Sequence, residues 1–312
     1  MSLSDTDRLA VGVLAENLSA TAPSMVDDLD WLAAARRMSC SLPPALGEGL
    51  RQFRHDPGAE GLLSITNLPI DGTVLPPTPA VADSVQRAGT VPAAVALLLG
   101  LHLGEVIAYR EEKQGALVQD VVPVPSLAAS QSNGGSVPLE LHTENAFHPN
   151  RPDYVGLLCL RGASDDVGTL VCSIRRALAV LEEPDLTTLA EPRFVTASPP
   201  SFRSGAPASA HAILSGAADD PDLRVDFNAT TAVDDEARQA LRRLRDAMMA
   251  VKSSVVLVPG QMVFLDNRIV VHGRSGFTPR YDGADRWLHR IFVHLDNRRG
   301  RERRDGNGAV LS

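Results

Sequence analysis

The stretch LVPGQMVFLDNRIVVHGRSGF, from Leu257 to Phe277, decides the fold class because it joins short apolar runs through turn signals. Pro259-Gly260 forms a tight turn between two strand-like runs. The second run leads through Asp266-Asn267 to a further apolar run that ends at His272. The pattern predicts neighbouring β-strands, with His272 near the end of one of them.

Similar runs follow one another along the chain after about Gly115. They are short, apolar and bounded by turns, which is typical of an antiparallel sandwich or barrel. One helical segment, DDEARQALRRLRDAMMAVK, interrupts them. The runs are ALVQDVVPV, VPLELH, YVGLLCL, GTLVCSI, RFVTAS, LRVDF, SVVLVP, QMVFLD and WLHRIFVHL.

The first part of the chain has a different pattern. From Asp5 to Phe53, apolar residues recur at intervals of three and four, which predicts amphipathic helices. GLLSITNLPI, residues 61–70, is a strand candidate that ends at a proline and an Asp-Gly turn. A broad apolar face predicts a buried helix from Pro92, where proline suits the first helical turn.

Composition excludes several classes of function. The 312 residues are 44% hydrophobic and 22% charged, with a formal net charge of -8, so a nucleic-acid-binding role is not expected. The most apolar segment, residues 91–103, is about half the length that a membrane span needs. The three cysteines suggest neither a disulfide framework nor a zinc ribbon. We therefore expect a cytoplasmic protein without a membrane partner, and leave its oligomeric state open.

The segment LELHTENAFHPNRPDY, from Leu139 to Tyr154, places His142 two residues before Glu144. A barrel that brings its late strands beside its middle ones could add His272 to this pair. Two imidazoles and one carboxylate form the facial triad of non-haem Fe(II) oxygenases and leave three coordination positions open. On spacing alone, ordinary structural histidines remain the alternative, and the same ligands would also suit zinc in a hydrolytic enzyme.

The segment YDGADRWLHRIFVHL contains two arginines, Arg286 and Arg290, on one strand candidate. The period-two alternation of a strand points both side chains to the same face. Apolar neighbours indicate that this strand is buried, and two buried guanidinium groups require anionic ligands or acidic side chains. A dicarboxylate cosubstrate and the carboxylate of an amino acid would satisfy them.

These motifs together resemble the clavaminate synthase-like branch of the iron(II)/2-oxoglutarate oxygenases. The resemblance lies in HTENAF, GTLVCSIRRAL and LDNRIVVHGRSGFTPRYDGADRWLHR, and within the branch it is greatest to the asparagine oxygenases. It implies an α+β, mainly β fold, with a double-stranded β-helix (jelly-roll, cupin-like) core flanked by N-terminal helices. It also implies a single domain over residues 1–312, with a helical flank to about residue 110 and an insertion or lid near residues 204–231.

The resemblance implies Fe(II) with 2-oxoglutarate and O2 as cosubstrates, and C3 hydroxylation of free L-asparagine with release of succinate and CO2. It also assigns roles to residues of this sequence. His142, Glu144 and His272 match the iron ligands, and Arg286 and Thr169 match residues that bind 2-oxoglutarate. Arg290 matches the arginine for the substrate carboxylate, Glu112 the acid for its ammonium, and Asn133 and Asp226 the contacts to its side-chain amide.

Other readings remain open at this point. An ammonium or guanidinium group would also accept Asp226, and related enzymes of the branch act on arginine or lysine. Asp222, four residues before Asp226, could add a second carboxylate near such a cation. The domain could also be a catalytically idle sensor that binds an amino acid or 2-oxoglutarate at the same ligands.

Overall fold

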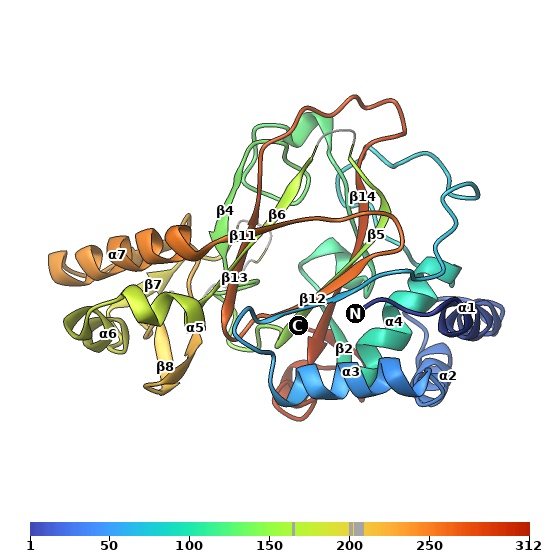
Figure 1. The fold of residues 1–312 in the computed structure, drawn as a ribbon, viewed down its shortest axis with the longest axis horizontal. Coiled ribbons are helices and arrows are strands. Elements are labelled where there is room, and N and C mark those ends of the chain that lie inside the picture. The colour runs from blue at the N-terminus through green and yellow to red at the C-terminus, as the bar shows by residue number, and fades with distance from the viewer. Residues whose placement is uncertain (164–165, 200–201, 203–208) are drawn as a thin grey trace.

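The computed structural model describes residues 1–163, 166–199, 202 and 209–312 (Figure 1). The predicted N-terminal helices are confirmed as α1 (Asp5–Ser19), α2 (Leu29–Ser39) and α3 (Pro44–His55). Polar side chains begin the first two, because Ser4 and Asp28 accept hydrogen bonds from the first free backbone N–H groups. Each of the three helices turns an apolar face inward.

The buried helix predicted from Pro92 is α4 (Val91–Leu103). It is apolar on nearly all sides because α1, α2 and α3 cover it on one side and strands of the large sheet on the other. Gly100 allows the helix to approach the sheet closely, since a Cβ atom at this position would lie 2.5 Å from Cδ1 of Ile291. The helical flank is therefore packed firmly on the sheet.

A large sheet forms the centre of the molecule. Its strand order is β1-β12-β5-β14-β2-β15, with β3 also paired to β14, and only the β15–β2 pair is parallel. The strands are β1 (Leu62–Ile65), β2 (Glu105–Tyr109), β3 (Gln119–Val121), β5 (Tyr154–Arg161), β12 (Met262–Asp266), β14 (Trp287–His294) and β15 (Val310–Leu311).

A second sheet has the order β11-β6-β13-β4 and carries much of the candidate site. Its strands are β4 (Leu139–His142), β6 (Gly168–Ser173), β11 (Ser253–Val256) and β13 (Val270–Arg274). Apolar side chains from both sheets, such as Leu141, Val271 and Phe292, fill one core. The predicted antiparallel sandwich or barrel is thus observed as two sheets that enclose a common interior.

Three helices (α5, α6 and α7) and the strands β7 and β8 lie on the side of the molecule away from α1, α2 and α4 (Figure 1). The predicted helical interruption is α7 (Asp235–Val251), which packs against α5 (Ile174–Ala177) and α6 (Glu183–Leu189). Two small sheets pair β7 (Phe194–Thr196) with β10 (Thr230–Ala232), and β8 (Leu214–Ala217) with β9 (Asp220–Leu223). Short 3-10 turns occupy Lys113–Gly115, Pro125–Leu127, Leu178–Val180 and Arg301–Arg303.

Three expectations about strands were wrong. The LRVDF run is not a strand, because β9 ends at Leu223 and Asp226 begins a turn by accepting hydrogen bonds from the N–H groups of Asn228 and Ala229. The strand at residues 61–70 is only β1, and Asn67 beyond it has a left-handed φ of 62°. The first central strand, β2, begins before Gly115.

The predicted division at about residue 110 remains a prediction, although β1 and β2 of the helical flank already join the large sheet. Of the predicted lid, residues 204–208 lie outside the described residues. The described remainder contains β8, β9 and the start of β10. In the part of the chain that the structure describes, no helix is both long enough and apolar enough to cross a membrane.

Candidate active site

His142 and His272 are brought together by the pairing of β4 with β13. The two residues are direct partners in the strand register, and their ring centroids lie 4.5 Å apart. Glu144 follows β4 by two residues, and its Oε2 lies 3.4 Å from Nε2 of His272. One possible ligand atom from each of the three side chains lies within 4.8 Å of the others. The predicted triad therefore exists as a geometric cluster of three metal-binding side chains.

Hydrogen bonds fix the orientation of this cluster. Nδ1 of His142 lies 2.9 Å from the carbonyl oxygen of Glu140. Since a carbonyl can only accept, Nδ1 carries the proton and Nε2 keeps its lone pair for a metal. Asn267 holds Glu144 from behind, because its Oδ1 accepts from the Glu144 N–H at 2.7 Å and its Nδ2 donates to the Glu144 carbonyl at 3.1 Å.

Protonation states also suit a metal. Burial and the neighbouring His142 lower the pKa of His272, so its imidazole is neutral at neutral pH. Burial alone raises the pKa of the Glu144 carboxyl, but the charge of Arg290 and its contacts with His272 outweigh this effect. The pKa of Glu144 therefore lies well below its ordinary value, and the site presents a neutral His272 imidazole beside the Glu144 carboxylate.

Arg290 is buried and surrounded by protein groups. Its Nη1 lies 3.0 Å from Oε1 of Glu144, its Nε lies 3.1 Å from Oε1 of Gln119, and Glu112 forms a further ion pair with it. With the Asn133 amide oriented to satisfy its neighbours, its oxygen accepts from Nη1 and Nη2 at 2.8 and 3.0 Å. Three residues predicted to bind substrate, Arg290, Glu112 and Asn133, thus lie beside Glu144.

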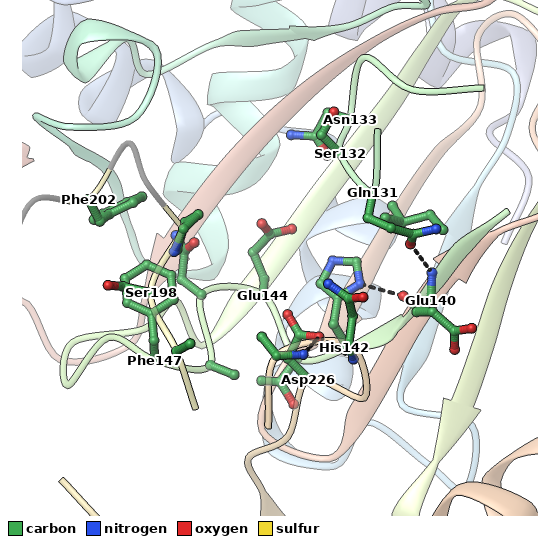
Figure 2. Close-up of a pocket in the computed structure, with 18 of the residues that line it drawn as sticks. Gln131, Ser132, Asn133, Glu140, His142, Glu144, Phe147, Ser198, Phe202 and Asp226 are labelled. Carbon is green, nitrogen blue, oxygen red and sulfur yellow. Dashed lines mark hydrogen bonds between the residues drawn. The ribbon is translucent and has the colours of Figure 1, made fainter. Parts of the chain in front are cut away.

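A cavity of about 520 Å³ opens over these groups. Figure 2 shows Asn133, His142, Glu144 and Asp226 around it. Asp226 is brought there because its segment runs along β4: Thr143 N–H donates to the Val225 carbonyl at 2.7 Å, and Phe227 N–H donates to the Leu141 carbonyl at 3.1 Å. The predicted amide contacts, Asn133 and Asp226, therefore line the same cavity as the metal-binding cluster.

Arg286 occupies a second, smaller cavity of about 40 Å³ that His272 also lines. Its Nη2 donates to Oγ1 of Thr169 at 3.3 Å, and the residue is 7% exposed. Burial lowers its pKa to about 10. Among the described residues, no carboxylate pairs with Arg286, in contrast to Arg290. A buried cation with one neutral partner fits a site for an anionic ligand.

Sequence reasoning missed three residues of the site. Arg274 also lines the smaller cavity, and its Nη2 donates to the Val137 carbonyl at 3.1 Å. It lies two residues after His272, so strand alternation could have placed it on the same face. Asn267 gives no sequence signal beyond its place between two strand candidates. Gln119 lies on β3 and gives no sequence signal of its role as a partner of Arg290.

Asp222, which could have helped to bind a substrate such as arginine, lies outside the larger cavity. Asp222 is exposed, belongs to β9 and pairs with Ser215 of β8. It is not among the residues that line the larger cavity. A second carboxylate beside Asp226, which would favour a cationic substrate side chain, is therefore not supplied by Asp222.

Two packed sheets with a His-Glu-His cluster, in which Glu144 and His272 are buried, are typical of the non-haem metal oxygenases of the jelly-roll class. Residues 93–292 match the family model "Taurine catabolism dioxygenase TauD, TfdA family". The chain belongs to this family of dioxygenases. The match and the likeness to solved oxygenase structures confirm the predicted fold class and the predicted oxygenase class.

Individual relatives are similar over the whole length. The chain is 45% identical to L-asparagine oxygenase of Streptomyces coelicolor, covering 100% of this chain and 94% of the relative. It is 36% identical to L-lysine 3-hydroxylase of Catenulispora acidiphila, covering 94% and 83%. A crystal structure of asparagine oxygenase with Fe(II), 2S,3S-3-hydroxyasparagine and succinate superimposes with a TM-score of 0.97 at 44% identity, covering 100% of this chain and 98% of that one.

Proposed function

We propose that this protein is an Fe(II)- and 2-oxoglutarate-dependent oxygenase that hydroxylates C3 of free L-asparagine. Succinate and CO2 are the coproducts. The observation that carries the oxygenase reading is the buried Arg286, which has no carboxylate partner among the described residues and shares a cavity with His272. The substrate assignment is supported by the 45% full-length identity to an L-asparagine oxygenase.

The proposed iron site consists of His142, Glu144 and His272. The donor set of two imidazoles and a carboxylate is the set that non-haem Fe(II) oxygenases use. Fe(II) bound there, together with 2-oxoglutarate and O2, supplies the oxidising chemistry. The protein's own part is to orient the ligands, to keep water out and to place one substrate carbon near the metal.

The proposed cosubstrate site uses Arg286 and Thr169. A guanidinium can bind one carboxylate through two parallel hydrogen bonds, and the Thr169 hydroxyl can add a third. Arg274 lines the same small cavity and contributes a second positive charge. The distal carboxylate of 2-oxoglutarate would pair with Arg286 and offset part of this positive charge.

The proposed substrate site uses Arg290, Glu112, Asn133 and Asp226. Arg290 would receive the α-carboxylate and Glu112 the α-ammonium, so a free amino acid fits better than one attached to a carrier. At the other end, the Asp226 carboxylate can accept the two amide hydrogens of asparagine, and Asn133 can donate to its oxygen. Both residues line the cavity above the metal-binding cluster.

A second candidate is hydroxylation of lysine or arginine by the same chemistry, which the 36% identity to L-lysine 3-hydroxylase supports. The exposed position of Asp222 speaks against it. A catalytically idle sensor or a zinc hydrolase would share the same ligands. We also place the protein in the cytoplasm, which the free cysteines Cys40, Cys159 and Cys172 support.

The test is an assay of all proteinogenic amino acids with the purified protein, Fe(II), 2-oxoglutarate and air, read by mass. We expect asparagine to gain one oxygen atom, together with succinate. Arginine or lysine turnover above that of asparagine would overturn the substrate assignment alone. Binding of an amino acid or 2-oxoglutarate without any formation of succinate would favour the sensor. Turnover of a substrate with zinc in place of iron, and without O2, would favour the hydrolase.

A further inference from the structure

The Asp226 backbone is the start of a chain of hydrogen bonds that leads away from the cavity. Its N–H donates to Oγ1 of Thr230 at 2.9 Å, which lies 2.8 Å from Oγ1 of Thr196. Oγ1 of Thr196 lies 2.9 Å from Nε2 of His211, whose Nδ1 lies 2.8 Å from the Ala212 carbonyl. Thr196, Thr230 and His211 are 3%, 7% and 9% exposed, so the chain is shielded from water.

The direction of every bond in this chain follows from its far end. The Ala212 carbonyl can only accept, so Nδ1 of His211 donates and Nε2 of the neutral ring accepts. Burial lowers the pKa of His211, which favours this neutral ring. The Thr196 hydroxyl must then donate to His211, and the Thr230 hydroxyl must donate to Thr196. The lone pairs of Thr230 are thereby directed to the Asp226 N–H.

The same turn fixes the Asp226 carboxylate. Its Oδ1 accepts from the N–H groups of Asn228 and Ala229 at 2.8 and 3.0 Å. The carbonyl oxygen of Asp226 also accepts from the Thr230 N–H at 2.7 Å. Oδ2 is thus the oxygen left to receive a substrate amide. Because Thr196 and Thr230 are register partners in the β7–β10 pair, the turn is anchored to a small sheet outside the two main sheets.

We propose that Thr230, Thr196 and His211 are positioning residues that hold the Asp226 carboxylate in place and thereby set the discrimination between asparagine and aspartate. The inference rests on the proposed function, in which Asp226 recognises the amide. A carboxylate held with one oxygen occupied offers a fixed acceptor to the amide hydrogens. A loosened carboxylate could turn aside and leave room for water or a cation beside an acidic substrate.

The test compares matched variants of the full-length protein. Thr230→Val removes the hydroxyl and keeps the shape, whereas Thr230→Ser keeps the hydroxyl. Thr231→Val is the control, because Thr231 is exposed and, within the described part of the chain, its hydroxyl makes a single long hydrogen bond, to the Val195 carbonyl at 3.4 Å. The readouts are kcat/KM for asparagine and for aspartate, KM for 2-oxoglutarate, and the denaturant midpoint of unfolding.

We expect Thr230→Val to lower the ratio of asparagine to aspartate kcat/KM by roughly tenfold, the effect of about one lost hydrogen bond. KM for 2-oxoglutarate should be unchanged in Thr230→Val. Thr230→Ser should keep the wild-type ratio of asparagine to aspartate kcat/KM, and so should Thr231→Val. If Thr230→Val does not fold, Thr196→Val and Thr196→Ser test the next link, with the same expected direction and rescue.

The inference would be overturned if Thr230→Val or Thr196→Val lowered stability but left the ratio of asparagine to aspartate kcat/KM unchanged. The threonines would then have a purely structural role. Equal loss of activity on both substrates would overturn it as well. Wild-type activity separates this failure from failure of the proposed function. If the wild type hydroxylates asparagine, only the inference is at stake, and if it does not, both are wrong.

Discussion

His142 and His272 face each other across the β4–β13 pair, with ring centroids 4.5 Å apart, although they come from distant parts of the sequence. Both backbones are held by the sheet, and Glu144 is fixed by Asn267. The cluster is therefore held in place by main-chain hydrogen bonds and buried packing. Such rigidity would suit the proposed role of these residues, which requires three ligands on one face of a metal and open positions opposite them.

Glu144→Ala should abolish iron-dependent turnover while the protein stays folded. One of three protein ligands is lost, and changes that affect ligands only indirectly already cost about 10- to 100-fold in metal affinity. Iron affinity and succinate formation are the measurements. Glu140→Ala is the matched control, because Glu140 lies on β4, four residues before Glu144, and its carboxylate pairs with Arg245. Wild-type iron affinity in Glu144→Ala would show that the triad is wrongly assigned.

Arg286 and Arg290 should respond in opposite ways to replacement by Met. Arg286→Met removes a buried cation without an acidic partner, so the ligand-free protein should gain about 1 kcal/mol or more of stability but lose its stabilisation by 2-oxoglutarate. Arg290→Met leaves Glu112 and Glu144 unpaired, so stability should fall by about 3–5 kcal/mol.

Urea unfolding with and without 2-oxoglutarate measures both effects. Arg280→Met, at an exposed arginine paired with Asp282, is the control for loss of a surface charge. In steady-state assays, Arg286→Ala should raise KM for 2-oxoglutarate and Arg290→Ala should mainly raise KM for the amino acid. Identical effects on both ligands would mean that the two arginines act structurally.

His148 should make stability depend on pH. Burial lowers its pKa to about 4 from an ordinary value of 6.5, and its Nδ1 accepts from the Asn150 N–H at 3.1 Å. Between these two values the unfolded chain holds a proton that the folded one does not. The contribution of His148 to the free energy of unfolding is therefore fully present above pH 6.5 and is lost as the pH falls toward 4. The expected loss between pH 7.5 and pH 5 is about 2 kcal/mol.

The measurement for His148 is the free energy of unfolding in urea at both pH values, for the wild type and for His148→Asn. Asparagine keeps an acceptor for the Asn150 N–H but does not titrate. The free energy of unfolding of His148→Asn should therefore fall by about 2 kcal/mol less than that of the wild type between pH 7.5 and pH 5. Other buried histidines, such as His211 and His294, titrate in both proteins and cancel in the comparison. Equal slopes in the two proteins would refute the assignment.

Asp226 should decide between asparagine and aspartate. In the wild type, the Asp226 carboxylate has nothing to donate to an acidic substrate, and sites of this kind discriminate by roughly 10⁴- to 10⁵-fold. Asp226→Ala should weaken asparagine turnover and narrow that gap. Asp226→Asn keeps an acceptor for the turn N–H groups and gains a donor, so it should move the preference toward aspartate. Competition assays with both substrates measure the ratio, and an unchanged ratio in both variants would remove Asp226 from the recognition site.

Much of the fold could be predicted because local sequence patterns indicate many of its helices and strands. Apolar spacing predicted α1, α4 and α7, and turn signals predicted the break between β11 and β12 at Pro259-Gly260, although these two strands belong to different sheets. The meeting of His142 with His272 required the strand register, which no local pattern specifies. The family resemblance supplied it. The conformation of polar residues that form local turns was predicted less accurately. Asp226 begins a turn where the sequence pattern predicted a strand.

The partners of the two arginines could not be foreseen from the sequence. Strand alternation predicted that Arg286 and Arg290 share a face, and it predicted that acids or ligands would meet them. It could not tell that Glu112 and Glu144 form ion pairs with Arg290, or that among the described residues Thr169 is the one hydrogen-bond partner of Arg286. These contacts depend on how separate strands and loops pack, which only the folded structure determines.

The most direct test of the account is the product formed from L-asparagine deuterated at C3, with Fe(II), 2-oxoglutarate and isotopically labelled O2. The account predicts one succinate for each product molecule, one labelled oxygen in the product, and loss of one deuterium from C3. Product with both deuterium atoms retained, or succinate without oxygen transfer to asparagine, would contradict it.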